Sequence, residues 1–297
     1  MEMIDRKRFL QISLAGAAGL IAGKAVAFSK DVMASEADVD VGVCTGFENG
    51  GMALDSGCSF LEEGVGKILM PDKPMEDFEA QLGRLDGSNG PGIRSFIYFL
   101  PGHLKAVGPE ADHDGIVSYA SKAFARVPKT GGRYVVFGSG GSRRVPDGFS
   151  HEEARTQFIE LCSRLAPEAA RYSVILAVEQ LNRSETNFLN TLAQAGNVVR
   201  AVNHPNFKMV CDIYHALKEE ETPDEIIKIG KDIVHCHIAE KDKRTPPGVA
   251  GDDFRPWFYA LKKIRYSGGI SLECNWTHFA SEISPAVSTV KQQWREA

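Results

Sequence analysis

The sequence predicts an α/β protein, built as a single (β/α)8 TIM barrel behind an N-terminal export signal. From residue 39 onward, short β-branched segments alternate with longer amphipathic ones. Eight such units of roughly 25–40 residues each follow one another, as a barrel of about 250 residues requires. No change of composition interrupts residues 39–297, which indicates one domain. The alternation also allows a doubly wound parallel sheet, which is the alternative fold.

Length and composition exclude several classes of protein. The chain has 297 residues, of which 43% are hydrophobic and 25% charged, so wholesale disorder and collagen-like repeats are excluded. The formal net charge of −5 disfavours a nucleic-acid binder, which usually presents a basic face. Six cysteines without CxxC spacing disfavour a zinc knuckle, and a core of this size needs no disulfide.

Residues 1–27 have the order of regions found in a bacterial export signal. Basic residues 6–8 precede a weakly apolar stretch over residues 9–25, and Ala25-Val26-Ala27 forms a small-x-small cleavage site. We expect a polar spacer over residues 28–38 and the barrel over residues 39–297. The apolar stretch is too short and too rich in glycine for stable membrane insertion. An amphipathic helix that stays attached is the alternative.

The run Asp5–Gln11 resembles the twin-arginine motif, with Lys7 in place of the second arginine. Twin-arginine export carries proteins that are already folded, which would suit a protein loaded with metal in the cytoplasm. We therefore expect an exported protein in the periplasm.

Eight segments carry β-branched runs bounded by Gly, Pro or polar turns, the pattern typical of strands. The expected strands are Val39–Cys44, Ser59–Glu62, Ile93–Phe99, Tyr134–Phe137, Ser173–Glu179, Lys208–Asp212, Ile233–Ile238 and Gly269–Glu273. Between them, Ser150 followed by Glu153 forms a capping box and predicts a helix from residue 151. Apolar spacing predicts further helices over Phe188–Val199 and Trp257–Ile264.

Strands five to eight end in side chains that can bind a metal ion: Glu179, Asp212, His237 and Glu273. In a closed barrel the carboxyl ends of neighbouring strands converge on one mouth. Three carboxylates that meet there must either hold protons or surround a cation. A histidine among hard oxygen ligands suits one divalent ion such as Mn²⁺, Co²⁺, Mg²⁺ or Zn²⁺. The alternative is that each polar residue merely ends its strand at the water boundary.

Neighbouring residues add further candidates. Lys243 and Arg244 lie on the next loop, where they could meet hydroxyl groups, a carboxylate or a phosphate. Candidate substrate contacts are Glu62 at the end of the second strand, His103 after the third, and Trp276 as a platform for a sugar face. A core or loop role is the alternative for each.

The second half of the chain resembles the xylose-isomerase-like TIM-barrel superfamily, above all the ketohexose 3-epimerases and hydroxypyruvate isomerase. The resemblance depends on four motifs in order, with a further likeness over residues 134–149. The four motifs are Val178–Glu185 (VEQLNRSE), Asp212–His215 (DIYH), His235–Glu240 (HCHIAE) and Leu272-Glu273.

That resemblance implies roles for several residues. Glu179, Asp212, His237 and Glu273 would bind one divalent metal, and Glu179 and Glu273 would also be the catalytic acid–base pair. Glu185 and His215 would bind substrate oxygens. The epimerases have an arginine six residues after the metal-binding histidine, where this chain has Lys243, with Arg244 one position later. The protein could also be a homo-oligomer, as relatives often are.

The expected activity is that of a sugar isomerase or epimerase on a small carbohydrate or keto-sugar. One carboxylate would remove the proton next to a carbonyl, and the metal would stabilise the enediolate. The same site could serve a lyase or hydratase acting on 3-keto-glycosides, and a non-catalytic sugar-binding barrel is a second alternative. Endonuclease IV shares the barrel, but the acidic charge and the export signal argue against that activity.

Overall fold

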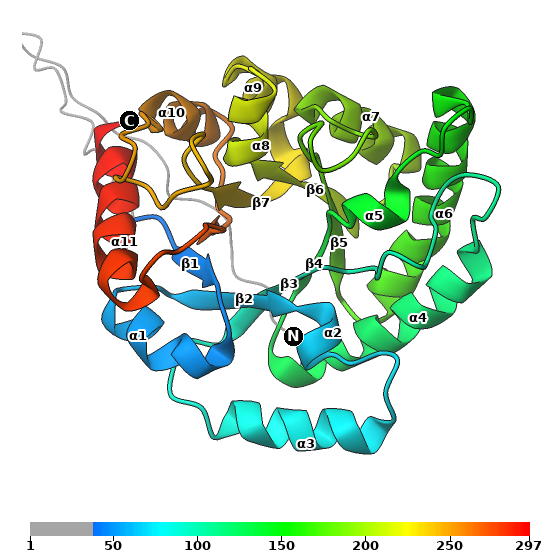
Figure 1. The fold of residues 1–297 in the computed structure, drawn as a ribbon, viewed down its shortest axis with the longest axis horizontal. Coiled ribbons are helices and arrows are strands. Elements are labelled where there is room, and N and C mark those ends of the chain that lie inside the picture. The colour runs from blue at the N-terminus through cyan, green and yellow to red at the C-terminus, as the bar shows by residue number, and fades with distance from the viewer. Residues whose placement is uncertain (1–37) are drawn as a thin grey trace, which may run out of the picture. The chain divides into compact units, whose positions relative to one another are not determined.

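The computed structural model describes residues 38–297, and in them eight parallel strands form a closed barrel (Figure 1). Each strand pairs with the next along the chain, and β8 pairs with β1. The strands are β1 Val41–Cys44, β2 Phe60–Gly64, β3 Ile93–Ile97, β4 Tyr134–Phe137, β5 Ile175–Glu179, β6 Phe207–Asp212, β7 Ile233–Ile238 and β8 Ile270–Leu272. The predicted barrel is confirmed, and the doubly wound sheet is excluded. The predicted export signal lies outside the described residues, as does nearly all of the spacer.

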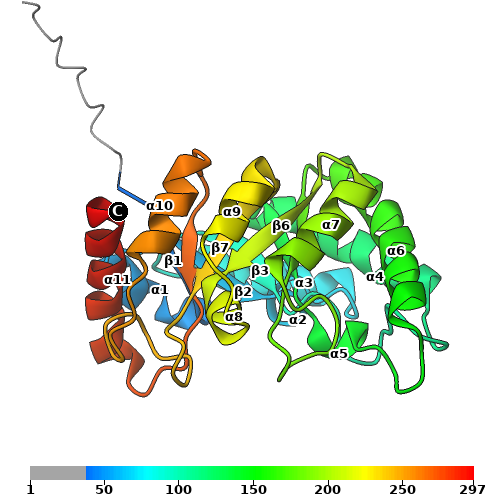
Figure 2. The same ribbon diagram turned by 90° about the horizontal axis from the view of Figure 1, so that it is seen from above.

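Helices surround the ring of strands, as the two ribbon views show (Figures 1 and 2). They are α1 Gly50–Asp55, α2 Val65–Ile68, α3 Met75–Asp86, α4 His113–Arg126, α5 Gly140–Arg143, α6 His151–Arg171, α7 Leu192–Val202, α8 Ile213–Lys218, α9 Asp224–Ile229, α10 Arg255–Lys263 and α11 Phe279–Glu296. Short 3₁₀ turns occupy Phe47–Asn49, Val127–Thr130 and Gly230–Asp232. Within residues 38–297, no helix combines the length and the apolar character needed to cross a membrane.

Capping residues explain where two of the predicted helices begin. The Ser150 side chain accepts a hydrogen bond from the Glu153 amide, so α6 begins at residue 151 as predicted. Helix α7 begins at residue 192 and not at Phe188, as the sequence pattern suggested. Leu189 has a φ of +56°, which a right-handed helix does not allow, and the Thr191 side chain caps α7 by accepting from the Gln194 amide.

Because successive side chains of a strand point to opposite faces, the buried apolar side chains form two separate clusters. Ile97, Val136, Ala177 and Val210 form a small buried cluster, distinct from the large core beneath the helices. Ala177 lies two residues before Glu179, and Val210 lies two residues before Asp212, so each pair shares one face of its strand. The apolar cluster therefore lies below the carboxylates, inside the barrel.

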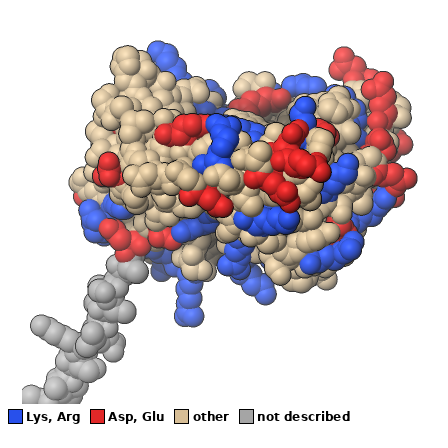
Figure 3. Space-filling view, turned by 90° about the horizontal axis from the view of Figure 1, so that it is seen from below, with Lys and Arg blue, Asp and Glu red and all other residues tan. Residues whose placement is uncertain are grey.

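Charged side chains of both signs are interspersed on the face of the molecule shown in Figure 3. Neither acidic nor basic residues gather there in one large patch.

Candidate metal centre and active site

The four strand-end residues that the sequence singled out lie together at the mouth of the barrel. Glu179 ends β5, Asp212 ends β6, His237 lies in β7, and Glu273 directly follows β8. Each offers a ligand atom, and these four atoms all lie within 4.8 Å of one another. The structure thus brings all four into one cluster.

Contacts within this cluster fit a cation. His237 Nδ1 lies 2.6 Å from Glu179 Oε1, 3.0 Å from Glu273 Oε2 and 3.8 Å from Asp212 Oδ2. One ring nitrogen therefore faces three carboxylates. Asp212 Oδ2 is buried and makes no hydrogen bond. A buried carboxylate oxygen without a donor is uncommon in proteins, and a divalent ion would satisfy it. The residues present therefore fit the expected metal.

Burial and mutual repulsion shift the pKa values of these groups. Burial raises the pKa of Glu179, and burial together with the Glu273 charge raises that of Asp212 to about 6. Burial alone would lower the pKa of His237, but the carboxylates around it raise that pKa well above its ordinary value. The cluster therefore attracts positive charge, which either a proton or a metal ion can supply.

A pocket with a volume of about 150 Å³ opens onto the cluster. Its ionisable lining consists of Glu179, Glu185, His215, Arg244 and Glu273. The rest of the lining consists of Ile97, Tyr98, Leu181 and residues 138–140. Glu185 and His215, expected to contact substrate, therefore line the same pocket as two of the metal-ligand candidates.

Of the two cations on the loop after β7, it is Arg244 that reaches the pocket. Arg244 Nη2 lies 2.7 Å from Glu273 Oε2, and its guanidinium lies 4.7 Å from the centre of the Tyr214 ring. Lys243 is exposed and does not line the pocket. Both residues have left-handed backbone conformations, and Asn275 holds this turn. Its amide N–H donates to the Arg244 carbonyl and its Nδ2 to the Lys243 carbonyl.

His215, in the first turn of α8, is held in one orientation. Its Nδ1 accepts hydrogen bonds from the backbone N–H and from Nδ2 of Asn182. The proton of the neutral ring is then on Nε2, which lies 3.6 Å from Asp212 Oδ2. Burial lowers the pKa of His215, so the neutral ring is favoured.

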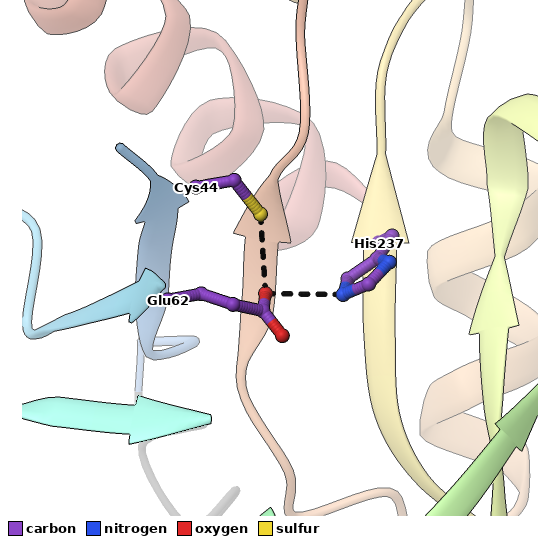
Figure 4. Close-up of side chains that lie close together, drawn as sticks. All are labelled: Cys44, Glu62 and His237. Atoms are coloured by element: carbon purple, nitrogen blue, oxygen red, sulfur yellow. Dashed lines mark hydrogen bonds and ion pairs between the residues drawn. The ribbon is translucent and has the colours of Figure 1, made fainter. Parts of the chain in front are cut away.

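Besides Lys243, three further residues predicted as substrate contacts lie outside the pocket. Glu62 is fully buried, bonds to Cys44, His235 and His237 (Figure 4), and does not line the pocket. His103 is exposed on the loop after β3 and is not part of the pocket lining either. The Trp276 ring stands at about a right angle to the Phe279 ring, with centroids 5.1 Å apart, and Trp276 does not line the pocket.

Tyr98 and Gly138 are two of the pocket residues that the sequence did not single out. Tyr98 is 70% exposed at the pocket and has a φ of +55°, a conformation that an L-residue adopts only under constraint. Gly138 follows β4, and a Cβ added there would lie 2.3 Å from Glu179 Oε2. The sequence pattern marks this glycine only as the end of the strand, and the room that it leaves for the Glu179 carboxylate becomes apparent only in the structure.

Comparisons with known proteins agree with this architecture. A family model for the xylose isomerase-like TIM barrel matches residues 72–297. L-ribulose 3-epimerase from Methylomonas sp. (strain DH-1) is 33% identical over 150 residues, 50% of this chain and 51% of that protein. The 3-dehydro-D-guloside 4-epimerase of Escherichia coli (strain K12) is 30% identical over 106 residues, 35% of this chain and 40% of that protein. The chain thus spans about half the length, or less, of these curated relatives.

A solved structure shows the same fold over most of the chain. The apo form of 3-keto-D-glucoside 4-epimerase from E. coli superimposes with a TM-score of 0.70, covering 86% of this chain and 99% of that one. The sequence identity in this alignment is 19%, so the likeness concerns the fold alone.

Proposed function

The chain belongs to the xylose isomerase-like TIM barrel family, and from this premise we propose that it is a metal-dependent sugar epimerase or isomerase. One observation carries the proposal. Glu179 and Glu273, from β5 and β8, both face the same pocket and both contact Nδ1 of His237. Two carboxylates around one small pocket are what proton removal and return at a carbon atom requires.

The four ligand candidates Glu179, Asp212, His237 and Glu273 would hold one divalent ion, Mn²⁺, Co²⁺, Mg²⁺ or Zn²⁺. When bound, it would stabilise the negative charge that develops on the carbonyl and hydroxyl oxygens of a sugar.

The two glutamates would divide the proton transfer between them. One carboxylate takes the proton from the carbon next to the carbonyl, and the other returns a proton to the opposite face of that carbon, which inverts the centre. If the proton returns to the neighbouring carbon, the product is the aldose–ketose isomer. Both carboxylates are at least five-sixths buried, so water competes little for these protons.

Arg244, Glu185 and His215 would orient the sugar. Each lines the pocket, and together they offer a guanidinium, a carboxylate and an imidazole Nε2–H. Such groups pair with hydroxyl oxygens and hydroxyl protons, and they fix which carbon faces the glutamates. A small carbohydrate or keto-sugar is therefore the proposed substrate class.

A keto-glycoside is the second candidate substrate, because both comparisons include an Escherichia coli 4-epimerase that is named for a 3-keto or 3-dehydro glycoside. After the same proton removal, a lyase would expel the group on the neighbouring carbon instead of inverting a centre. The first steps are shared, so the products distinguish the two activities. A non-catalytic sugar-binding barrel would leave both substrates unchanged.

Metal content and turnover, measured together, test the proposal. The chain from residue 28 would be purified, analysed for bound metal, and incubated with free ketohexoses and with a 3-keto-glycoside. We expect one divalent ion per chain and an epimerised or isomerised sugar. Release of the aglycone would assign the lyase activity. A chain without metal, whose melting temperature Mn²⁺ does not raise, would contradict the metal site.

We also propose that the protein is exported to the periplasm, on the pattern of residues 1–27. Fusion of these residues to a reporter that functions only after twin-arginine export tests this. Replacing Arg6 by lysine, which leaves lysines at both positions of the pair, should abolish transport, and a reporter that stays in the cytoplasm with the native sequence would contradict the proposal.

A further inference from the structure

We propose that Glu62 is a positioning residue for the metal ligand His237. By accepting a hydrogen bond from the Nε2–H group, Glu62 makes Nδ1 the nitrogen that faces the metal. This inference rests on the proposed metal site, and concerns a residue outside the four-ligand cluster. Glu62 lies on β2, 175 residues before His237 in the sequence, and the two strands are not neighbours in the sheet.

One oxygen of Glu62 is the centre of a buried hydrogen-bond network. Oε2 lies 3.0 Å from His237 Nε2, 3.2 Å from His235 Nε2 and 3.2 Å from Cys44 Sγ. Figure 4 shows the Cys44 thiol and the His237 ring approaching this oxygen from β1 and β7. Glu62, His235 and His237 are all fully buried, so water does not compete for these bonds.

The state of Glu62 follows from its surroundings. Three groups that can donate a hydrogen bond, two imidazole nitrogens and a thiol, lie around its Oε2, as expected for an ionised carboxylate. An ionised carboxylate only accepts hydrogen bonds, so each partner must donate. The Cys44 S–H and the two Nε2–H groups supply three donors to the one oxygen.

This arrangement selects one tautomer of His237. A ring that binds a metal through one nitrogen keeps a single proton, and the bond to Glu62 places that proton on Nε2. Nδ1, the nitrogen that lies 2.6 Å from Glu179 Oε1 and 3.0 Å from Glu273 Oε2, would then give its lone pair to the metal. A carboxylate behind a metal-binding histidine fixes the ring and makes it a stronger ligand.

His235 anchors the carboxylate from below. Its ring stacks on Tyr134 at 5.9 Å and lies 6.0 Å from the Phe60 ring, so it has little freedom to turn. Its Nε2 donates to Glu62, which explains why the first histidine of His235-Cys236-His237 is absent from the four-ligand cluster.

The atoms around Glu62 are also close enough to hold a second ion, since ligand atoms of Cys44, Glu62 and His237 lie within 4.8 Å of one another. Hydrogen bonds account for these distances. Cys44 Sγ lies 3.4 Å from Ser271 Oγ as well as 3.2 Å from Glu62 Oε2, so the thiol has hydrogen-bond partners on two sides. An ion there would also require His237 to lose the Nε2 proton that it donates to Glu62.

The wild-type chain provides the first test. With Zn²⁺ as a diamagnetic probe, ¹⁵N spectra of the histidine rings should show His237 with a proton on Nε2 and the metal on Nδ1. Metal on Nε2 would overturn the proposal, and so would two zinc ions per chain. This measurement needs no variant, so it decides the question even where a variant fails to fold.

The second test compares two substitutions on the same strand. Glu62→Gln keeps the shape but turns an amide N–H₂ toward the donors. The dissociation constant for Mn²⁺, measured by competition with a fluorescent chelator, should rise about 10–100-fold. Glu63→Gln is the matched control. Glu63 is also buried, but it accepts from the Phe47 amide and from Lys67, outside the metal cluster, so metal affinity should not change.

The outcomes separate this inference from the proposed function. A folded E62Q chain with unchanged Mn²⁺ affinity and an unchanged His237 tautomer overturns the role of Glu62 and leaves the metal site intact. A wild-type chain that binds no divalent ion overturns both. Weakened binding in E62Q alone, with a shifted His237 ¹⁵N spectrum, supports the role and is not explained by a general loss of stability.

Discussion

The two halves of the barrel contribute to the site in different ways. Strands β5–β8 end in the ionisable side chains that meet at the mouth, whereas β1–β4 contribute support and space. From the first half come the buried Glu62 behind His237, the exposed ring of Tyr98, and Gly138, which leaves room for Glu179. A functional site therefore depends both on groups that converge and on a frame that orients them and leaves them room.

The largest effect should follow from changing the acid–base pair in the second half. Glu179→Gln or Glu273→Gln should lower kcat by roughly 10²–10⁴-fold, because each removes one partner in proton transfer. Much of the bound metal and the melting temperature should be retained. Steady-state kinetics and metal analysis check this, with Glu160→Gln on the exposed face of α6 as the control. Full activity in either variant would refute the pair.

The next effect tests whether the first half acts by leaving space. Gly138→Ala would place a Cβ 2.3 Å from Glu179 Oε2, so the carboxylate must move. A displacement of this kind can cost about 10²-fold in kcat/KM. Gly141→Ala is the control in the same loop, because its Cβ would meet nothing closer than 3.7 Å. Equal activity of the two variants would show that this space is not needed.

Substitution of the two neighbouring cations on the loop after β7 should lower kcat/KM to different extents. Arg244→Ala removes a guanidinium 2.7 Å from Glu273 and should lower kcat/KM about 10–100-fold, as expected for charge-assisted hydrogen bonds of about 1.5–3 kcal/mol. Lys243→Ala changes an exposed side chain and should stay within about twofold. The opposite order of effects would assign the substrate contact to Lys243.

The smallest effect concerns Glu221, an acid of the second half that lies outside the pocket. Burial raises its pKa to about 7, while both of its oxygens accept from the Leu192 amide at the start of α7. Between about pH 4.5 and pH 7 the folded chain holds this proton more tightly than the unfolded chain, so the contribution of Glu221 to stability falls as pH rises.

Unfolding of wild-type and Glu221→Gln chains, followed from pH 4 to pH 8, checks this sign. As pH rises, the free energy of unfolding of the wild-type chain should fall relative to that of the variant. The expected change is about 1 kcal/mol after allowance for solvent screening of a partly exposed group. A difference that stays constant with pH would show that the pKa of Glu221 is the same in the folded and unfolded chains.

Local sequence patterns were sufficient to predict features that depend on a single strand or a single helix cap. β-branched runs located all eight strands, and the capping box at Ser150 located the start of α6. The metal-ligand candidates also followed from local pattern, because they end consecutive strands and a closed barrel brings such ends together. The start of α7 was wrong by four residues, since the left-handed Leu189 interrupts an apolar pattern that looks helical.

Contacts between segments far apart in the sequence could not be predicted from such local patterns. The pairing of Glu62 with His237 joins residues 175 positions apart. Arg244, and not Lys243, lies in the pocket, where two left-handed residues are held by Asn275 from the loop after β8. Sequence periodicity thus specifies the strands and the order of the residues at their ends, because these depend on side-chain alternation along one segment. Which side chain faces the pocket and which supports it depends on packing across the barrel, where single hydrogen bonds between distant strands select the orientation.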